Sequence, residues 1–109
     1  MAENGATPTT LAKRDDILTR TRRIVQQRLE GFGGRVFLFG SWARGDERRT
    51  SDIDLGIWCE DASTGHRIAQ LQSDLEESTI PYRVEVVDLR AVSEAFRARV
   101  RAEGIEWNV

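Results

Sequence analysis

Residues 39–58, FGSWARGDERRTSDIDLGIW, decide the fold expected for this 109-residue chain. The run that leads into them, Arg35–Phe39, predicts a short β-strand that is apolar on both faces. Asp52–Trp58 predicts a second strand, because its first residues alternate acidic and apolar side chains. Between the two, Gly40–Ser51 is polar and has no sustained apolar period, so we expect a turn, able to include one helical turn, followed by a loop.

Outside these two strands, the chain has patterns typical of three helices and one more strand. Apolar residues spaced three, four and seven apart predict the first two helices. Ser93 is a good N-cap for the third, and Ile105 and Trp107 are expected to fold back onto the body. The expected elements are helices from Thr9 or Thr10 to about Glu30, from about His66 to Glu77 and from Ser93 to about Ala102, and a strand over Tyr82–Leu89.

This order of elements predicts the fold class. Helix, strand, strand, helix, strand, helix is typical of an α/β (α+β) fold, a small sheet of about three to four strands with helices mainly on one face. A chain of 109 residues has room for one modest core. We therefore expect a single domain over residues 10–109, preceded by a flexible N-terminal tail over residues 1–9.

Composition and net charge argue against several classes of protein. Sixteen basic and 18 acidic residues give a net charge of -2, which argues against binding held mainly by nucleic acid or an anionic membrane. The single cysteine, Cys59, rules out an internal disulfide framework and fits a reducing compartment. The longest apolar run, Val36–Phe39, is too short to span a membrane, and the first ten residues lack the apolar core of a secretory signal. The expected location is the cytoplasm.

Asp52 and Asp54 are the first candidates for chemistry. Two residues apart on a strand, their side chains point the same way, with Cα atoms roughly 6–7 Å apart. Two carboxylates on one face repel each other, and a divalent cation removes that repulsion. Mg²⁺ typically takes one or two carboxylates together with substrate phosphates. A bare Asp-x-Asp is equally compatible with a solvated strand end.

Gly40 and Ser41 add a second element at the end of the first strand. Glycine lets the backbone approach a bulky anion because it has no Cβ, and a serine that opens a helical turn offers a hydroxyl and free N–H groups. An ordinary strand-to-helix turn also uses Gly-Ser freely. The Gly-Ser pair indicates a phosphate site only in combination with the two aspartates.

Together, Gly40-Ser41, ten further residues and Asp52-x-Asp54 resemble the signature of the nucleotidyltransferase superfamily that includes DNA polymerase β. The full run over residues 39–58 is similar to its smallest members, the minimal nucleotidyltransferases. The resemblance implies the palm-like fold of polymerase β and transfer of a nucleoside monophosphate from a nucleoside triphosphate. It also implies that Gly40 and Ser41 hold the β- and γ-phosphates and that Asp52 and Asp54 bridge two Mg²⁺ ions.

A third carboxylate in this family normally comes from the neighbouring strand, where the chain departs from the pattern. Family members usually have Asp where Glu85 stands, and Asp88 matches a further acidic position. On a regular strand Glu85 and Asp88 face opposite sides, so at most one can meet the two aspartates. The register favours Glu85 as the third catalytic and metal-binding carboxylate, and an edge charge paired with an arginine is the alternative.

Basic side chains near the turn are candidates for nucleotide binding. Arg44, Arg48 and Arg49 lie between the turn and the aspartates, where a cation can steady a triphosphate. We single out Arg44 and Arg48, although exposed arginines are common. Trp42 and Trp58 flank the motif and are expected to bury apolar area rather than to stack on a base.

The resemblance also implies a partner. Many minimal nucleotidyltransferases are antitoxins that bind an all-helical ribonuclease toxin of the HEPN class and transfer AMP from ATP to one of its tyrosines. This chain is thus expected to be a Mg²⁺-dependent, ATP-using protein adenylyltransferase with a HEPN toxin partner, binding neither membrane nor nucleic acid.

Two other functions remain open. One is a module that neutralises its partner by binding alone; Glu85 in place of Asp favours it, and the intact Gly40, Ser41, Asp52 and Asp54 argue against it. The other is a tRNA- or antibiotic-modifying transferase, which usually adds a second domain for the acceptor, and 109 residues leave no room for one.

Overall fold

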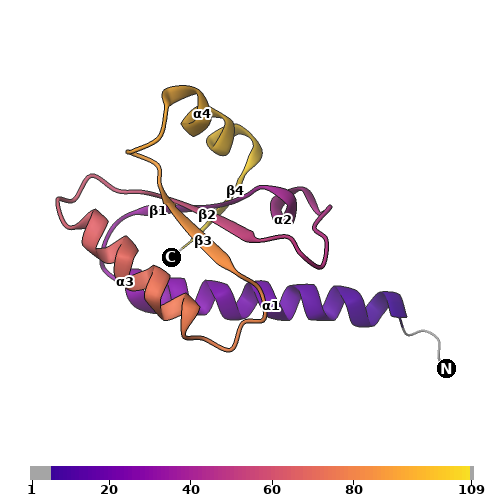
Figure 1. Cartoon of the computed structure of the whole chain (residues 1–109). Coiled ribbons are helices and arrows are strands. Elements are labelled where there is room, and N and C mark those ends of the chain that lie inside the picture. Colours follow the sequence, from indigo (N-terminus) through magenta and orange to yellow (C-terminus); the bar gives the residue numbers. More distant parts are fainter. Residues whose placement is uncertain (1–5, 109) are drawn as a thin grey trace.

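The computed structural model describes the backbone of residues 6–108 and the side chains of residues 13–108. Four helices alternate with four strands along the described part of the chain (Figure 1). The helices are α1 (Ala6–Leu29), α2 (Ser41–Arg44), α3 (Thr64–Glu76) and α4 (Glu94–Glu103), and the strands are β1 (Arg35–Phe39), β2 (Ile53–Trp58), β3 (Val84–Asp88) and β4 (Ile105–Trp107).

The four strands form one mixed sheet in the order β3-β2-β1-β4. Strand β1 runs antiparallel to both β2 and β4, whereas β2 and β3 are parallel and are joined through α3. The long helices α1 and α3 cover one face of the sheet, and α4 lies on the other (Figure 1). The predicted fold class, a small sheet with helices mainly on one face, is confirmed.

Alternation along the strands separates two apolar clusters. Val36 and Leu38 of β1 pack with β2 and with the inner sides of α1 and α3 in the larger cluster. Phe37 points to the opposite face and packs with Leu89 and with Val100 of α4 in the smaller one. Because side chains of a strand alternate between faces, each face of the same strand has its own environment.

Most predicted boundaries agree with the structure to within two residues, and two differences are informative. Helix α1 begins at Ala6, three residues before Thr9, so it includes residues 6–9 of the predicted tail over residues 1–9, and residues 1–5 lie outside the described residues. The segment that was expected to fold back forms strand β4, in which Trp107 is buried and Ile105 is exposed. Pairing with β1 holds this segment, since Val36 lies opposite Trp107.

The predicted N-cap of α4 is confirmed. The Ser93 Oγ accepts a hydrogen bond from the Phe96 N–H at 3.1 Å, as expected of an N-cap at the start of α4. None of the helices, over the residues described, is both long and apolar enough to cross a membrane.

Candidate active site

A row of three side chains crosses the sheet where β1 ends. Phe39 of β1 pairs in register with Asp54 of β2, and Asp54 pairs with Glu85 of β3. Residues paired across neighbouring strands point to the same face, with strands about 4.8 Å apart. The row therefore lies on the face that carries α4, with the two carboxylates side by side.

Asp52 completes a group of three carboxylates. It is exposed and directly precedes β2, two residues before the half-buried Asp54. Burial raises the pKa of Asp54 above its ordinary value, and repulsion from Glu85 and then Asp52 adds to the rise, while Arg44 opposes it. The three negative groups thus interact, and no ion pair relieves Glu85 among the side chains of residues 13–108. Such a set favours a bound cation.

Asp88 takes no part in this group. It pairs with Ile57, whose side chain belongs to the opposite face of β2, and its Oδ1 accepts a hydrogen bond from the Arg90 N–H at 2.9 Å. Of the two acidic residues proposed for the third position, the register brings Glu85, not Asp88, to Asp54.

Gly40 brings the backbone against the carboxylates. Its φ of 76° lies in the left-handed region that favours glycine, and a Cβ added there would overlap Asp54 Oδ2. Any side chain at this position would displace the carboxylate or the turn. Ser41 follows Gly40 as the first residue of α2.

Buried contacts fix the orientation of α2. Trp42 is 2% exposed in the main core, its ring meets Tyr82 edge to face at 5.0 Å, and its indole N–H donates to the Ser51 carbonyl at 3.4 Å. Trp42 therefore buries apolar area, as expected, and ties the turn to the loop that leads into Asp52. Trp58 is half-buried on the α4 face, with the Arg97 guanidinium 5.0 Å from its ring.

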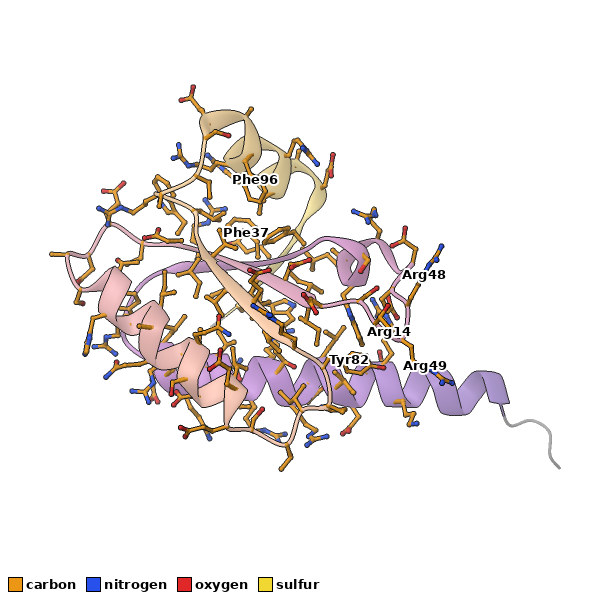
Figure 2. All side chains as sticks on the ribbon, viewed as in Figure 1. Arg14, Phe37, Arg48, Arg49, Tyr82 and Phe96 are labelled. Carbon is orange, nitrogen blue, oxygen red and sulfur yellow. The ribbon has the colours of Figure 1, made fainter. Side chains whose placement is uncertain are left out.

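The predicted basic residues separate into two regions. Arg44 lies near enough to lower the pKa of Asp54, and its Nε is 3.3 Å from Asp46 Oδ2. Arg48 and Arg49 line a different cavity, together with Lys13 and Tyr82. Figure 2 shows both at the loop beside Tyr82 and α1. The structure thus brings Arg44 but not Arg48 to the carboxylates.

The carboxylates suit a hard divalent cation bound together with a phosphate ligand. In the described part of the chain, no three acidic, His or Cys side chains converge tightly enough to hold a metal ion by themselves. Mg²⁺ does not require that, because it keeps waters and binds through one or two carboxylates plus substrate phosphates. Asp52, Asp54 and Glu85 fit this mode, offering only oxygen donors.

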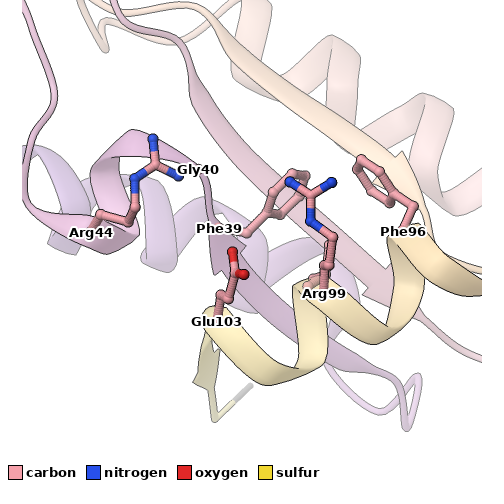
Figure 3. A pocket seen from close by; sticks show the side chains of 7 residues that line it. Phe39, Gly40, Arg44, Phe96, Arg99 and Glu103 are labelled. Carbon is pink, nitrogen blue, oxygen red and sulfur yellow. The ribbon is translucent and has the colours of Figure 1, made fainter.

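Helix α4 adds residues that the sequence analysis did not single out. Phe96, Arg99 and Glu103 line a cavity whose other wall is formed by Phe39 and Gly40 (Figure 3). No local signal marks them, because they lie more than 40 residues after Asp52 and only the folding of α4 onto β1 brings them to the turn.

Comparisons with known proteins agree with this geometry. Residues 34–106 match the family described as Polymerase beta, Nucleotidyltransferase. The Haemophilus influenzae protein named "Probable protein adenylyltransferase MntA" is 32% identical over 84 residues, which make up 77% of this chain and 72% of that protein. The family match includes the whole run from Gly40-Ser41 to Asp52-x-Asp54.

Two solved structures have the same fold. A structure described as a toxin-antitoxin with AMP-PNP has a TM-score of 0.63 and 26% identity, with 80% of this chain and 73% of that chain covered. A minimal nucleotidyltransferase has a TM-score of 0.58 and 30% identity, with 95% of this chain and 98% of that chain covered. The fold implied by the resemblance is confirmed.

Proposed function

Because this chain belongs to the polymerase β-like nucleotidyltransferase family, we propose that it transfers AMP from ATP to a tyrosine hydroxyl of a HEPN ribonuclease toxin and acts as its antitoxin. The observation that carries the proposal is the register that aligns Asp54 with Glu85, beside Asp52 and the Gly40 turn. The relatives add the partner class: one is named a protein adenylyltransferase, and another is a toxin-antitoxin crystallised with AMP-PNP.

In the proposed reaction, the tyrosine oxygen attacks the α-phosphorus of ATP. A bond forms from that oxygen to phosphorus, the bond from phosphorus to the bridging oxygen breaks, and pyrophosphate leaves in line. The hydroxyl proton passes to a nearby base, for which the carboxylates of Asp52, Asp54 and Glu85 are candidates. The products are the adenylylated toxin and pyrophosphate.

The chain's residues would position charge rather than form covalent bonds. Asp52, Asp54 and Glu85 would hold Mg²⁺, which supplies neutralisation of phosphate charge and a lower pKa for the attacking hydroxyl. Gly40 and Ser41 would receive the β- and γ-phosphates, where the missing Cβ leaves room for a bulky anion. Arg44, beside Asp54, would offset the charge of the leaving pyrophosphate. A phosphate-binding role for Arg48 stays a prediction.

A second candidate function is an antitoxin that binds and occludes its partner without turnover. It is favoured by the Glu85 that stands in place of the usual Asp, a side chain one methylene longer. The described carboxylates also do not converge on one point. In this case Asp52 and Asp54 would matter little for protection against the toxin.

The test is label transfer from ATP carrying a radioactive α-phosphate, with Mg²⁺ and lysate from the source cells. We expect a labelled band whose mass spectrum shows an adenylylated tyrosine of a HEPN protein. Asp52→Asn and Asp54→Asn should each reduce labelling by at least about 10²-fold, as expected when charge stabilisation of the transition state is lost. Asp88→Asn, on the other face of β3, is the matched control and should label normally.

Cell protection separates the two candidate functions. If Asp54→Asn and Asp52→Asn still protect cells from the toxin while the wild type labels nothing with any nucleoside triphosphate, the protein acts by occlusion. Normal labelling by either variant would contradict the assignment of the carboxylates.

A further inference from the structure

The cavity between α4 and the Gly40 turn has a volume of about 180 Å³. It is lined by Phe39, Gly40, Arg44, Phe96, Arg99, Val100 and Glu103. Pockets that enclose a whole drug-sized ligand are usually about 300–1,000 Å³, so this one suits a single ring system.

Its position links it to the carboxylates. Phe39 is the direct register partner of Asp54, one strand away, and points to the same face. Gly40, in the same wall, is the residue whose added Cβ would overlap Asp54 Oδ2. The cavity and the carboxylate group therefore adjoin on one face of the sheet, where Phe39 lies next to Asp54.

Two phenyl rings form the apolar part of the cavity wall, beside three charged side chains. The rings of Phe39 and Phe96 meet edge to face with centroids 5.7 Å apart, and the buried Val100 also lines the cavity. Arg99 and Glu103 project from α4 towards Phe39 and Gly40 (Figure 3). A flat ring can pack on the phenyl groups and beneath a guanidinium.

We infer that this cavity receives the base of the nucleotide and that Glu103 selects a base carrying an exocyclic amine. The inference rests on the proposed function and specifies its substrate site. With the phosphates at Gly40 and Ser41 and the α-phosphate at Asp54, the nucleoside reaches the adjoining cavity. Phe96 supplies the stacking surface, and the Glu103 carboxylate, an acceptor only, accepts from the amine.

A phosphate is the other ligand that the arginines could attract. Phenyl walls do not replace the hydration of a phosphate, and the carboxylate of Glu103 repels it. A base loses less hydration free energy than a phosphate when it leaves water, and it gains a stacking contact with the phenyl ring. The composition of the cavity therefore favours the base over the terminal phosphates.

The experiment measures dissociation constants by calorimetry with three Mg²⁺-containing probes: ATP, ITP and inorganic tripolyphosphate. ITP keeps the purine but has a carbonyl in place of the amine. We expect Phe96→Ala and the milder Phe96→Leu to weaken ATP binding, the former about tenfold or more, and to leave tripolyphosphate unchanged. Arg101→Ala, on the same helix but outside this cavity, is the matched control.

Glu103→Gln tests the selection of the base. The wild type should bind ATP about tenfold more tightly than ITP, and the variant should lose most of this preference because an amide can donate to the ITP carbonyl. An unchanged preference, or equal weakening of ATP and tripolyphosphate by Phe96→Ala, would overturn the inference. ATP binding that ignores both substitutions would overturn it while leaving the proposed function intact. A folded wild type that binds no ATP would overturn both.

Discussion

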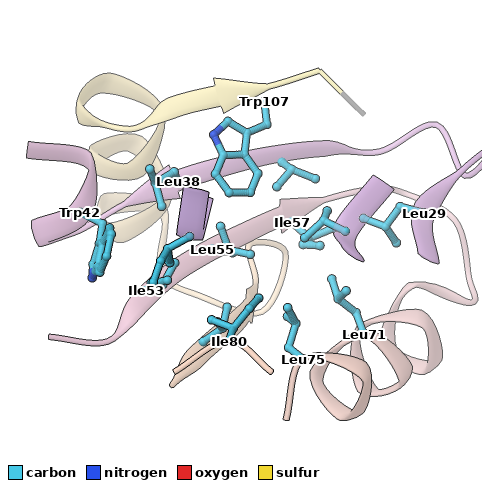
Figure 4. Packing of buried hydrophobic residues seen from close by; sticks show 14 residues of the cluster. Leu29, Leu38, Trp42, Ile53, Leu55, Ile57, Leu71, Leu75, Ile80 and Trp107 are labelled. Atoms are coloured by element: carbon cyan, nitrogen blue, oxygen red, sulfur yellow. The ribbon is translucent and has the colours of Figure 1, made fainter. Parts of the chain in front are cut away.

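The two faces of strand β2 have different environments, although neighbouring residues in the sequence supply their side chains. Ile53, Leu55 and Ile57 are fully buried against α1 and α3 (Figure 4), whereas Asp54, between them, points to the other face and remains half-buried. The buried face is covered by two long helices, and the Asp54 face only by the short α4. Stability is therefore concentrated on one face, and the acidic group lies on the other, less covered face.

The largest expected effect comes from breaking the packed face. Leu55→Ala removes a side chain that is 0% exposed and leaves a cavity between the sheet and its helices. We expect a loss of about 4 kcal/mol in the free energy of unfolding, measured by urea denaturation. Ile105→Ala is the control, because Ile105 is 47% exposed on β4 and should cost well under 1 kcal/mol. Similar losses for both would mean that the helix-covered face is not the main source of stability.

Gly40 lies at the end of β1, against the Asp54 carboxylate on the other face of the sheet. Gly40→Ala forces an alanine to a φ of 76° and against the Asp54 carboxylate, so we expect a stability loss of about 2 kcal/mol and loss of AMP transfer. Gly45→Ala has nearly the same strain, at a φ of 80°, but meets no atom within 4 Å. It should cost about 1 kcal/mol and leave transfer intact. Equal transfer by the two variants would show that the contact with Asp54 is irrelevant.

Substitution of Asp54 should raise stability, in contrast to the losses expected from Leu55→Ala and Gly40→Ala. Its pKa is raised in the fold by burial and by repulsion from Glu85 and Asp52. The folded state thus holds this proton more tightly than the unfolded chain, and ionisation of Asp54 lowers stability as pH rises from its ordinary pKa through the raised one. Asp54→Asn removes that penalty, so its melting temperature should exceed that of the wild type at pH 7.

The advantage of Asp54→Asn should shrink as pH falls through the raised pKa and be absent below the ordinary value of 3.8. Thermal unfolding followed by circular dichroism between pH 3 and pH 7 measures it. Asp88→Asn removes one negative charge from the opposite face of β3 and should give no such gain. A melting temperature of Asp54→Asn below that of the wild type at pH 7 would refute the repulsive arrangement.

The smallest effect on stability is expected from the partly exposed ion pair that joins α1 to α3. Arg28 of α1 holds Asp74 of α3 through two hydrogen bonds of 2.7 and 3.0 Å. This contact lowers the pKa of Asp74, so its stabilisation is present above the ordinary pKa of Asp and is lost as pH falls through the lowered one. Asp74→Asn should reduce the melting temperature at pH 7 slightly, far less than Leu55→Ala, and not at strongly acid pH. A lower melting temperature of Asp74→Asn that persists at strongly acid pH would show that the effect comes from packing and not from the ion pair.

Much of the fold follows from local patterns. The apolar spacing of α1 and α3, the Ser93 cap and the run Arg35–Phe39 predict elements that the structure contains. The differences from the predicted elements arise where tertiary contacts decide the structure. Strand β4 exists because Trp107 is buried beside Val36, and β3 begins at Val84 rather than Tyr82, whose ring packs against Trp42. The single domain over residues 10–109 and the catalytic roles remain predictions.

The sequence by itself determined which candidate site residues the chain offers: a Gly-Ser turn, two aspartates of like orientation, and an acidic residue on a following strand, because spacing along a strand sets which side chains share a face. Only the tertiary structure decided that Glu85 rather than Asp88 lies beside Asp54, that Arg44 and Arg48 separate, and that Phe96 and Glu103 adjoin Gly40. Register between strands and the packing of α4 depend on contacts between residues distant in sequence, and no local pattern encodes those.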